Sequence, residues 1–458
     1  MAITSTTSSA SVQSSEAGQT SYAPALAVLT TLFFIWGSLT SLNDVLIPFA
    51  QHVFSLNLAE SMLIQTAFFL AYFVISLPAA KIIDWIGYKR AIIVGLSTMV
   101  AACLLVYPAA KIPSFPFFLT ALMILAAGIT VLQVAANPYV AVLGKPETAS
   151  SRLNLTQAFN SLGTAVFPWV GARLILGETV SAAAQAASQD AVIKLYVYFF
   201  AILLVLLAIL FAAFRLPKME AAERHGEKIN DSIWKHPNLP LGAIGIFVYV
   251  GAEVAIGSSI ANYLALDNIG HFATDIADPA ARYHAALAVA ARYISIYWLG
   301  AMVGRFIGSA VLQKLKTSRV LAFCAAIATL LVVITVITSG HFAMWTVLSI
   351  GLFNSIMFPS IFTSGIAELG PLTGDGSGLL NMAIVGGAII PWVVGRIGDA
   401  INHAYYPAMI QGETSWGQGI HYALILAAFC YLYILYYAVS GSKPNSERYG
   451  RAPVEARS

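Results

Sequence analysis

The sequence predicts an all-α integral membrane protein whose twelve transmembrane helices form two parallel repeats of six helices. Three observations support this fold class. Of the 458 residues, 59% are hydrophobic and only 10% are charged, and the mean hydropathy is +0.78, which is not typical of a soluble globular chain. Apolar runs of about 20 residues, the length that crosses a bilayer, recur along the chain. A polar connection at 217–238 divides these runs into two sets of six.

The order of the elements follows from these runs. A disordered tail is expected at 1–22, because it is rich in Ser, Thr and Ala and has no Lys or Arg. A six-helix bundle is expected at 23–216, with spans that begin near residues 24, 59, 91, 115, 152 and 193. After the linker, a second bundle at 239–441 has spans that begin near residues 239, 288, 320, 342, 376 and 419, and a tail follows at 442–458.

Basic residues predict the topology. They gather in alternate connections, chiefly in the linker and in the C-terminal tail, and the positive-inside rule assigns such connections to the cytoplasm. We therefore expect a multi-pass protein of the plasma membrane, the inner membrane of a bacterium, with both termini in the cytoplasm.

The two halves share a motif. GTAVFPWVGAR, from Gly163 to Arg173 in the predicted fifth span, matches GGAIIPWVVGR, from Gly386 to Arg396 in the eleventh. Corresponding positions in the halves indicate a parallel repeat, whose substrate site lies between the halves near the middle of the membrane. The fourth and tenth spans each contain an internal proline. The backbone groups that these prolines free must be satisfied by neighbours or by cavity water.

The connection DWIGYKR between the second and third spans follows the pattern D-x-x-G-x-K/R. Gly87 permits a tight turn, and Asp84 with Lys89 and Arg90 is predicted to form a cytoplasmic latch that breaks when the halves rock. The corresponding loop of the second half, 313–319, lacks the Asp and the Gly, so any such latch is one-sided. An ordinary turn with positive-inside charges is the alternative interpretation.

Two acids lie inside apolar spans, Asp44 in the first and Glu253 in the seventh. A carboxylate at this depth costs about 2.5–3.5 kcal/mol on insertion scales, so it needs a wet cavity, a partner or a proton. Both are predicted proton-coupling residues. The alternatives are that Asp44 braces a helix kink beside Pro48, and that Glu253 forms a buried pair with Arg305 or Arg292. Arg305 is also predicted to brace a gate near the cytoplasmic end of the eighth span.

Neutral amides form the predicted substrate site. Gln157 and Asn160 are three residues apart and share a helix face. Amides both donate and accept hydrogen bonds, which suits a polyhydroxylated ligand, although they can instead hold helices together. The other candidates are Asn43, Gln133, Asn137, Asn262, Asn354 and Asn381.

The chain resembles the fucose, galactose and glucose:cation symporter family of the major facilitator superfamily over essentially all of Leu26 to Ala438. The segments that carry the resemblance best are SLNDVLIPF, AANPYVAVLG, SRLNLTQAFNSLG, YVGAEVAIGSS and SIMFPSIF. The resemblance implies that Asp44 and a fourth-span glutamate serve proton coupling and sugar binding, and that Gln157 and Asn160 line the sugar cavity. Here Gln133 replaces that glutamate, which resembles the glucose/galactose transporter branch and leaves coupling to protons, to sodium or to neither open.

The predicted function is secondary active import of a hexose, glucose or galactose, with a cation by alternating access. We favour a proton, because a lone carboxylate among amides offers few hard oxygen ligands for a metal. The alternatives are a sodium-coupled or uncoupled hexose transporter, or a symporter of fucose or another polyol. No enzyme is expected, because H-E-x-x-H and G-x-S-x-G are absent from the sequence. The expected partners are the hexose, the coupling ion and the lipid bilayer; no cofactor, metal or nucleic acid is expected, and we expect a monomer.

Overall fold

The computed structural model describes residues 22–54, 63–112, 114–171, 190, 192–217, 231–405 and 418–449. The regular secondary structure within these ranges is helical throughout, without a strand. The predicted tails lie largely outside them, but the C-terminal tail is not wholly irregular. Asn445–Tyr449 forms the short helix α18, because the Glu368 carboxylate accepts hydrogen bonds from the backbone N–H and the hydroxyl of Ser446.

The N-terminal half contains the predicted first six spans. Its second and third spans follow each other directly and are separated by a kink at Gly87. This residue has φ 77° and ψ 165°, a conformation that favours glycine and turns the chain. The helices are α1 (Ala23–Phe54), α3 (Leu63–Lys111), α4 (Phe115–Val142), η1 (Pro146–Thr148), α5 (Ala149–Gly171), the π-helical η3 (Lys194–Ala201) and α7 (Ile202–Ala213).

The C-terminal half contains the remaining six spans, several of them in consecutive pieces. They are η5 (Ile233–Lys235), α8 (Asn238–Leu264), α9 (Pro279–Ala290), η6 (Ala291–Tyr293), α10 (Ile294–Val311), α11 (Thr317–Ile337), α12 (Gly340–Asn354), α13 (Met357–Gly365), η7 (Gly370–Leu372), α14 (Thr373–Met382), η8 (Ala383–Val385), α15 (Gly386–Tyr405), α16 (Gly419–Ala423), α17 (Ile425–Tyr436) and η10 (Tyr437–Gly441).

Ten helical stretches of the described residues are long and apolar enough to cross a membrane. One of them is α3, which holds two spans joined at Gly87. The helix α5 is not among the ten, because its serine, asparagine and glutamine side chains lower its hydropathy, yet it packs between α1 and α10 like a span. The described helices therefore account for the twelve predicted spans.

The eighth span begins earlier than the predicted residue 288. Its first helix, α9, begins at Pro279 because Asp278 caps it: the Asp278 carboxylate accepts from the backbone N–H of Ala281 at 2.8 Å. A capping aspartate followed by proline at the first helical position is a helix start signal. Hydropathy alone misses this start.

The shared motif of the two halves performs the same packing role in each. A Cβ at Gly163 of α5 would lie 2.4 Å from the Phe34 carbonyl oxygen of α1. A Cβ at Gly386 of α15 would lie 2.0 Å from the Phe247 carbonyl oxygen of α8. Each glycine therefore lets the fifth span of its half approach the backbone of the first span, and the repeat in the sequence is a repeat in the packing.

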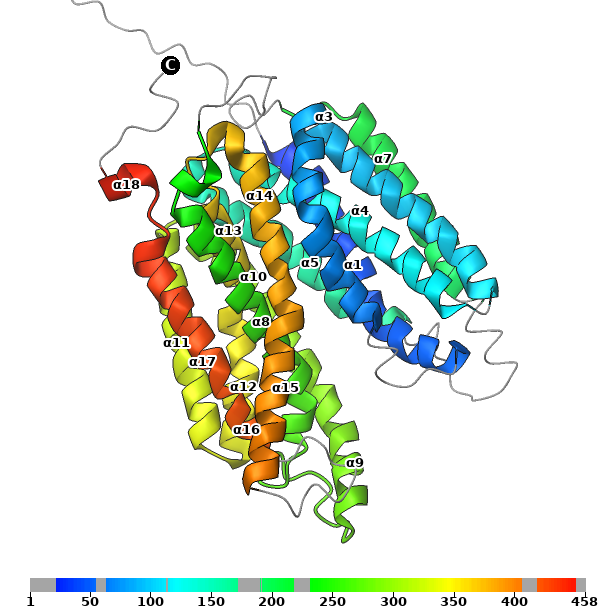
Figure 1. The fold of residues 1–458 in the computed structure, drawn as a ribbon, viewed down its shortest axis with the longest axis vertical. Coiled ribbons are helices and arrows are strands. Elements are labelled where there is room, and N and C mark those ends of the chain that lie inside the picture. Colours follow the sequence, from blue (N-terminus) through cyan, green and yellow to red (C-terminus); the bar gives the residue numbers. More distant parts are fainter. Residues whose placement is uncertain are drawn as a thin grey trace, which may run out of the picture.

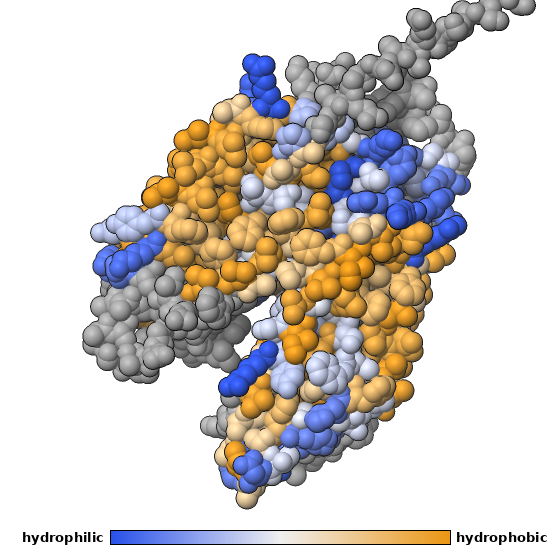
Figure 2. Space-filling view, turned by 180° about the vertical axis from the view of Figure 1, so that it is seen from behind, coloured by the Kyte–Doolittle hydropathy of each residue, from blue (hydrophilic) through white to orange (hydrophobic). Residues whose placement is uncertain are grey.

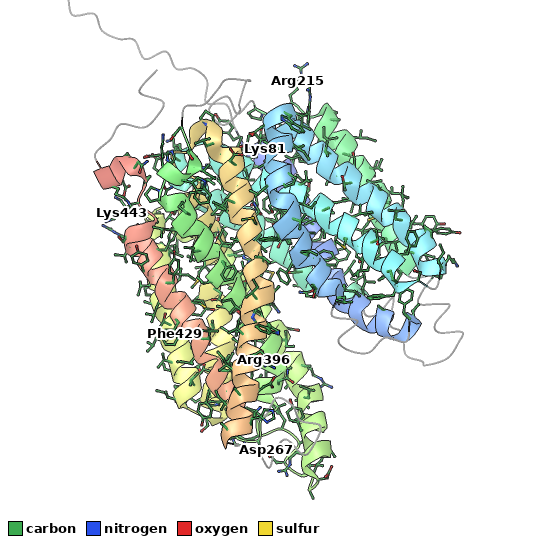
Figure 3. All side chains as sticks on the ribbon, in the orientation of Figure 1. Lys81, Arg215, Asp267, Arg396, Phe429 and Lys443 are labelled. Atoms are coloured by element: carbon green, nitrogen blue, oxygen red, sulfur yellow. The ribbon has the colours of Figure 1, made fainter. Side chains whose placement is uncertain are left out.

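The two halves meet at one end and diverge at the other (Figure 1). The helix α14 contacts α3 and α4, and α5 contacts α10 and α13, whereas the opposite ends of the halves lie apart. Figure 2 shows the opening between the halves from behind, with apolar residues over much of both lobes. We call the joined end, with Lys81, Ser150, Thr363 and Asp375, the closed end. Lys81, Arg215 and Lys443 lie toward it, and Asp267 lies toward the opposite end (Figure 3).

Candidate functional site

Buried amides of α4 and α5 lie between the closed end and the opening. Gln133 donates through Nε2 to the Tyr72 hydroxyl of α3, and Gln157 Nε2 lies 3.5 Å from Asn137 Oδ1. The Asn137 Nδ2 atom is buried without a hydrogen-bond partner. Because a buried unpaired amide is costly, this cluster favours a polar ligand.

The predicted partner of Gln157, Asn160, has a different neighbour. It is half-buried, and its Nδ2 donates to the Phe33 carbonyl of α1 at 3.0 Å. The backbone is equally close there, since a Cβ at Gly37 would lie 2.3 Å from the Asn160 carbonyl oxygen. Asn160 thus holds α5 to α1, while Gln157 holds α5 to α4.

Two of the candidate amides in the C-terminal half are fully buried. Asn354 of α12 donates to the Tyr297 hydroxyl at 2.6 Å, and Asn381 of α14 donates to the Ser377 carbonyl at 2.8 Å. Each leaves its Oδ1 without a partner. Among the candidate amides, the N-terminal half therefore offers an unpaired donor at Asn137, and the C-terminal half offers two unpaired acceptors.

Asn262 is not brought to this region. It lies nine residues beyond Glu253 on α8, about 13 Å along a helix, and its Oδ1 accepts from the Tyr283 hydroxyl at 3.0 Å. Its position near the C-terminal end of α8 separates it from the other amides. Asn43 and Asp44 belong to α1, but their side chains lie outside the described part of the chain, so their predicted roles stay predictions.

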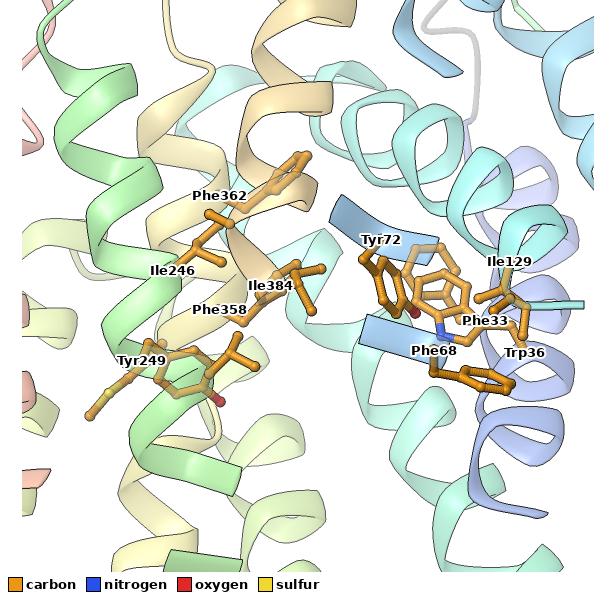
Figure 4. Close-up of a cluster of buried hydrophobic side chains, with 14 of the residues drawn as sticks. Phe33, Trp36, Phe68, Tyr72, Ile129, Ile246, Tyr249, Phe358, Phe362 and Ile384 are labelled. Carbon is orange, nitrogen blue, oxygen red and sulfur yellow. The ribbon is translucent and has the colours of Figure 1, made fainter. Parts of the chain in front are cut away.

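Aromatic side chains accompany the amides from both halves. Figure 4 shows Trp36, Phe68 and Tyr72 in one group and Tyr249 and Phe358 in another, with the interior of the molecule between the groups. Aromatic faces with polar edges suit the apolar face of a sugar ring.

Glu253 is a buried acid with a defined set of contacts. Its Oε1 accepts from the Tyr249 hydroxyl at 2.8 Å and lies 3.9 Å from Arg305 Nη2. The Tyr297 hydroxyl lies 3.4 Å from the Glu253 backbone carbonyl. Of the two arginines left open by the sequence, Arg305 is the partner, whereas Arg292 is exposed on η6.

Arg305 connects three separate elements. Its Nε donates to the Ser355 carbonyl at 3.2 Å, and its Nη1 donates to the Ser161 hydroxyl of α5, in the other half. The Ser355 carbonyl is available because the residue four positions later is Pro359, which has no N–H to donate. Arg305 therefore joins the break between α12 and α13 to the N-terminal half, and its role at a gate stays a prediction.

Pro138 frees a carbonyl in the same way. The residue four positions earlier is Val134, and its carbonyl oxygen accepts from the Ser377 hydroxyl of α14 at 2.8 Å. Neighbouring side chains thus satisfy both proline-freed carbonyls, as the sequence predicted. The bond from Ser377 also crosses between the halves.

The charged contact at the closed end differs from the predicted latch. Lys81 Nζ lies 3.7 Å from Asp84 Oδ2 and 3.2 Å from Asp375 Oδ1 of α14. Lys89 instead donates to the Ala212 carbonyl of α7 at 2.9 Å, within its own half, and Arg90 is exposed. Helical spacing places Lys81, three positions before Asp84, on the same face of α3, and the latch with Lys89 and Arg90 stays a prediction.

Hydroxyl groups close the other side of the joined end. Ser150 Oγ lies 2.5 Å from Thr363 Oγ1 and accepts from Thr317 Oγ1 at 2.9 Å. Ser151 donates to the Ser309 carbonyl at 2.7 Å, and Ser309 donates back to the Ser151 carbonyl at 3.1 Å. We call these five residues the hydroxyl seam. Charged groups thus join the halves on one side of the closed end, and the hydroxyl seam joins them on the other. The only sequence signal of this seam was the adjacent serine pair in SSRLN.

No metal centre is evident in the described ranges, where His, Cys, Asp and Glu form no group of three or more suited to an ion. The site instead combines amides, aromatic rings and one buried acid between two helical bundles, and this combination suits the binding of an uncharged polar solute.

Comparisons with known proteins agree with this architecture. A family model described as Major Facilitator Superfamily matches residues 27–391. A glucose/galactose transporter of Brucella abortus biovar 1 (strain 9-941) is 48% identical over 427 residues, 93% of this chain and 96% of that protein. An L-fucose-proton symporter of Escherichia coli (strain K12) is 32% identical over 415 residues, 85% and 90% of the two chains. A crystal structure of a Major Facilitator Superfamily transporter, FucP, in the outward conformation superposes with a TM-score of 0.78 at 29% identity, over 92% of this chain and 99% of that one. The chain belongs to the Major Facilitator Superfamily.

Proposed function

We propose that this protein is a symporter that imports a hexose, glucose or galactose, together with a proton by alternating access. The observation that carries the proposal is the set of unpaired amide atoms that the halves offer between them: Asn137 Nδ2 from one, and the Oδ1 atoms of Asn354 and Asn381 from the other. A sugar hydroxyl both accepts and donates, so one hexose can satisfy donors and acceptors together. The names of the related transporters support the substrate class.

The binding energy of such a site comes from pairing groups that are otherwise left unpaired. A buried polar group without a partner costs about 1–3 kcal/mol, and a site built to bond a hydroxyl strongly rejects an analogue that lacks it. Gln157 fixes Asn137 at 3.5 Å, and Tyr72 and Tyr249 give each half an aromatic wall. A hexose deoxygenated at a bonded position should therefore bind poorly.

The proposed topology follows from charge. The closed end carries Lys81, Arg215 and Lys443, and positive-inside residues face the cytoplasm. The protein then lies in the plasma membrane with both termini inside, and this conformation is open to the outside. The bundles 23–216 and 239–441 are the two bodies that rock about the site.

Proton coupling is proposed for Asp44 and Glu253. Gln133 cannot ionise, so the fourth span contributes an amide that bonds Tyr72 and no second carboxylate. Coupling then depends on the acids of the first and seventh spans. Sodium coupling is the competing proposal, in which Asp44 and Asn43 supply oxygen ligands.

The deciding experiment is transport by the purified protein in vesicles. Uptake of labelled glucose, galactose, fucose and mannose is measured with an imposed proton gradient, with an imposed sodium gradient and with neither. Concentrative uptake of glucose or galactose that needs the proton gradient supports the proposal. Accumulation that collapses without sodium and survives a proton uncoupler at a clamped sodium gradient contradicts it. For amide variants of the site such as Gln157→Ala, the matched control is Asn445→Ala, which loses an exposed bond to the Lys235 carbonyl outside the spans.

A further inference from the structure

Arg305 is a positive charge on α10 that contacts both halves and the buried acid Glu253 at the same time. Only 12% of its side chain is exposed. We infer that Arg305 ties loss of the proton from Glu253 to the opening of the closed end, so that the proton leaves only when the halves separate there. This inference rests on the proposed proton symport and adds a positioning residue to it.

The Arg305 guanidinium donates hydrogen bonds to both halves. Nη1 bonds Ser161, and Nε bonds the Ser355 carbonyl at 3.2 Å. Glu253 Oε1 lies 3.9 Å from Nη2, beyond the range of a hydrogen bond. The closed conformation therefore holds the arginine close to the carboxyl group without a direct bond to it.

Separation of the halves removes the bond between Arg305 and Ser161. Ser355 and Glu253 belong to the same half as Arg305, whereas Ser161 belongs to α5 of the other half. When α5 moves away from α10, Nη1 loses the Ser161 hydroxyl as its acceptor and becomes free to donate to another group. Glu253 is the acid beside it in its own half, and a shift of about 1 Å brings Nη2 from 3.9 Å into hydrogen-bond range.

The freed Arg305 guanidinium can then act on the carboxyl group of Glu253. The groups that face Glu253 are Tyr249 on its own helix, Tyr297 on α10, Tyr431 on α17 and Arg305. Three are phenols, so among the described neighbours Arg305 supplies the charge. A direct charge-assisted bond from arginine favours the carboxylate over the carboxylic acid.

One proton is taken up and released in each transport cycle. In the conformation open to the outside, a proton from outside water binds a Glu253 carboxyl oxygen. When the closed end opens, the O–H bond breaks, the proton passes to water on that side, and Arg305 compensates the carboxylate charge. When the halves close again, Ser161 takes back the Arg305 hydrogen bond, and Glu253 can accept the next proton.

Ser161 also links this step to the sugar. Its hydroxyl lies 3.2 Å from the Gln157 carbonyl as a donor, one helical turn away on α5. The helix that holds the arginine in the closed conformation is therefore the helix that carries Gln157 and Asn160. Movement of α5 changes the sugar site and the Arg305 contact together.

The test uses the full-length protein in vesicles and two substitutions with opposite expected effects. Ser161→Ala frees Arg305 to bond Glu253 in every conformation, so the external pH of half-maximal proton-driven hexose uptake should fall by about one unit. Arg305→Gln removes the charge but keeps an amide donor, so Glu253 should retain its proton. Its concentrative uptake should fall at least tenfold, the pH midpoint should rise, and sugar-for-sugar exchange should persist.

Three controls make the outcome decisive. Ser349→Ala removes a hydroxyl that donates to the Trp345 carbonyl of its own helix α12, away from Arg305 and from the hydroxyl seam, and its pH midpoint should stay at the wild-type value. Arg305→Lys keeps the charge and should retain pH-dependent uptake, and Arg305→Gln combined with Glu253→Gln should be no worse than either alone. If Arg305→Gln does not fold, the midpoint of Ser161→Ala decides alone.

Two failures are distinguishable. Wild-type uptake that ignores the proton gradient overturns both the proposed coupling ion and this inference. Proton-driven wild-type uptake, with Ser161→Ala and Arg305→Gln shifting the midpoint in the same direction or not at all, overturns the inference alone and makes Arg305 a structural brace.

Discussion

Gly378 on α14 sets how closely the two halves approach at the closed end. A Cβ at this position would lie 2.9 Å from Ala80 Cβ and 3.0 Å from the Ser76 carbonyl oxygen, both on α3. The carbonyl belongs to a helix backbone and cannot turn away alone, so Gly378→Ala must push α14 and α3 apart. Overpacking of this kind costs about 1–3 kcal/mol. The cost applies only to the closed conformation, since the two helices separate when the end opens.

The expected magnitude follows from this one-sided cost. Alanine improves helix propensity by about 1 kcal/mol, but it does so in both conformations, so this gain cancels. A penalty near 2 kcal/mol shifts the ratio of the two conformations roughly 30-fold toward opening of the closed end, because each 1.4 kcal/mol is a factor of ten. Gly378→Ala should therefore favour the conformation in which the closed end is open.

The assay is the labelling rate of a cysteine in the seam. Thr363→Cys introduces a thiol at a position that is 8% exposed, and a membrane-impermeant maleimide applied to the cytoplasmic side reports opening. The native cysteines are buried and give a low background: Cys103, Cys324 and Cys430. Gly395→Ala is the matched control, since a Cβ there has nothing within 4 Å. Equal labelling rates in Gly378→Ala and Gly395→Ala would refute the reasoning.

Three further outcomes are expected from the candidate site. Gln157→Ala and Asn160→Ala should each weaken hexose binding at least tenfold, about 1.4 kcal/mol, in equilibrium binding to the detergent-solubilised protein; wild-type affinity in both would move the site elsewhere. Asp84→Asn should slow transport in vesicles while leaving that affinity nearly unchanged, because Asp84 lies at the closed end beside Lys81; unchanged turnover would reduce the motif to a turn. Asp44→Asn should abolish accumulation driven by a pH gradient and spare sugar-for-sugar exchange, since exchange does not require return of the empty carrier; retained accumulation would remove Asp44 from coupling.

The sequence predicted what depends on composition and local pattern. Hydropathy predicted the helical spans, and the shared Gly163 and Gly386 motif predicted the repeat that the packing on α1 and α8 confirms. The internal prolines predicted freed carbonyls, and both have side-chain donors. Each of these predictions follows from the geometry of one helix or from the periodicity of the chain.

The identity of a partner across the interface could not be predicted in the same way. Lys81 contacts Asp375 across 294 positions, and Arg305 contacts Ser161 across 144. Which cation serves Asp84 depends on the face that α3 presents to α14, and this is a tertiary property. The hydroxyl seam was missed for a second reason: serine and threonine occur throughout apolar helices, where they usually bond the carbonyl four residues earlier, as Ser38 does.

The contacts that close the joined end are individually weak, and a transporter needs them to be so. Among the described residues they include hydroxyl–hydroxyl and hydroxyl–carbonyl bonds, the contact of Lys81 with Asp375 and the Arg305 bond to Ser161. A hydrogen bond contributes only about 0.5–1.5 kcal/mol net when water can replace it, and an exposed ion pair contributes about 0–1 kcal/mol. Water can enter as this end opens, so a few kcal/mol separate the two conformations. A hexose that binds at micromolar to millimolar concentration contributes about 4–8 kcal/mol. This binding energy is sufficient to offset that difference if the hexose contacts both halves at once.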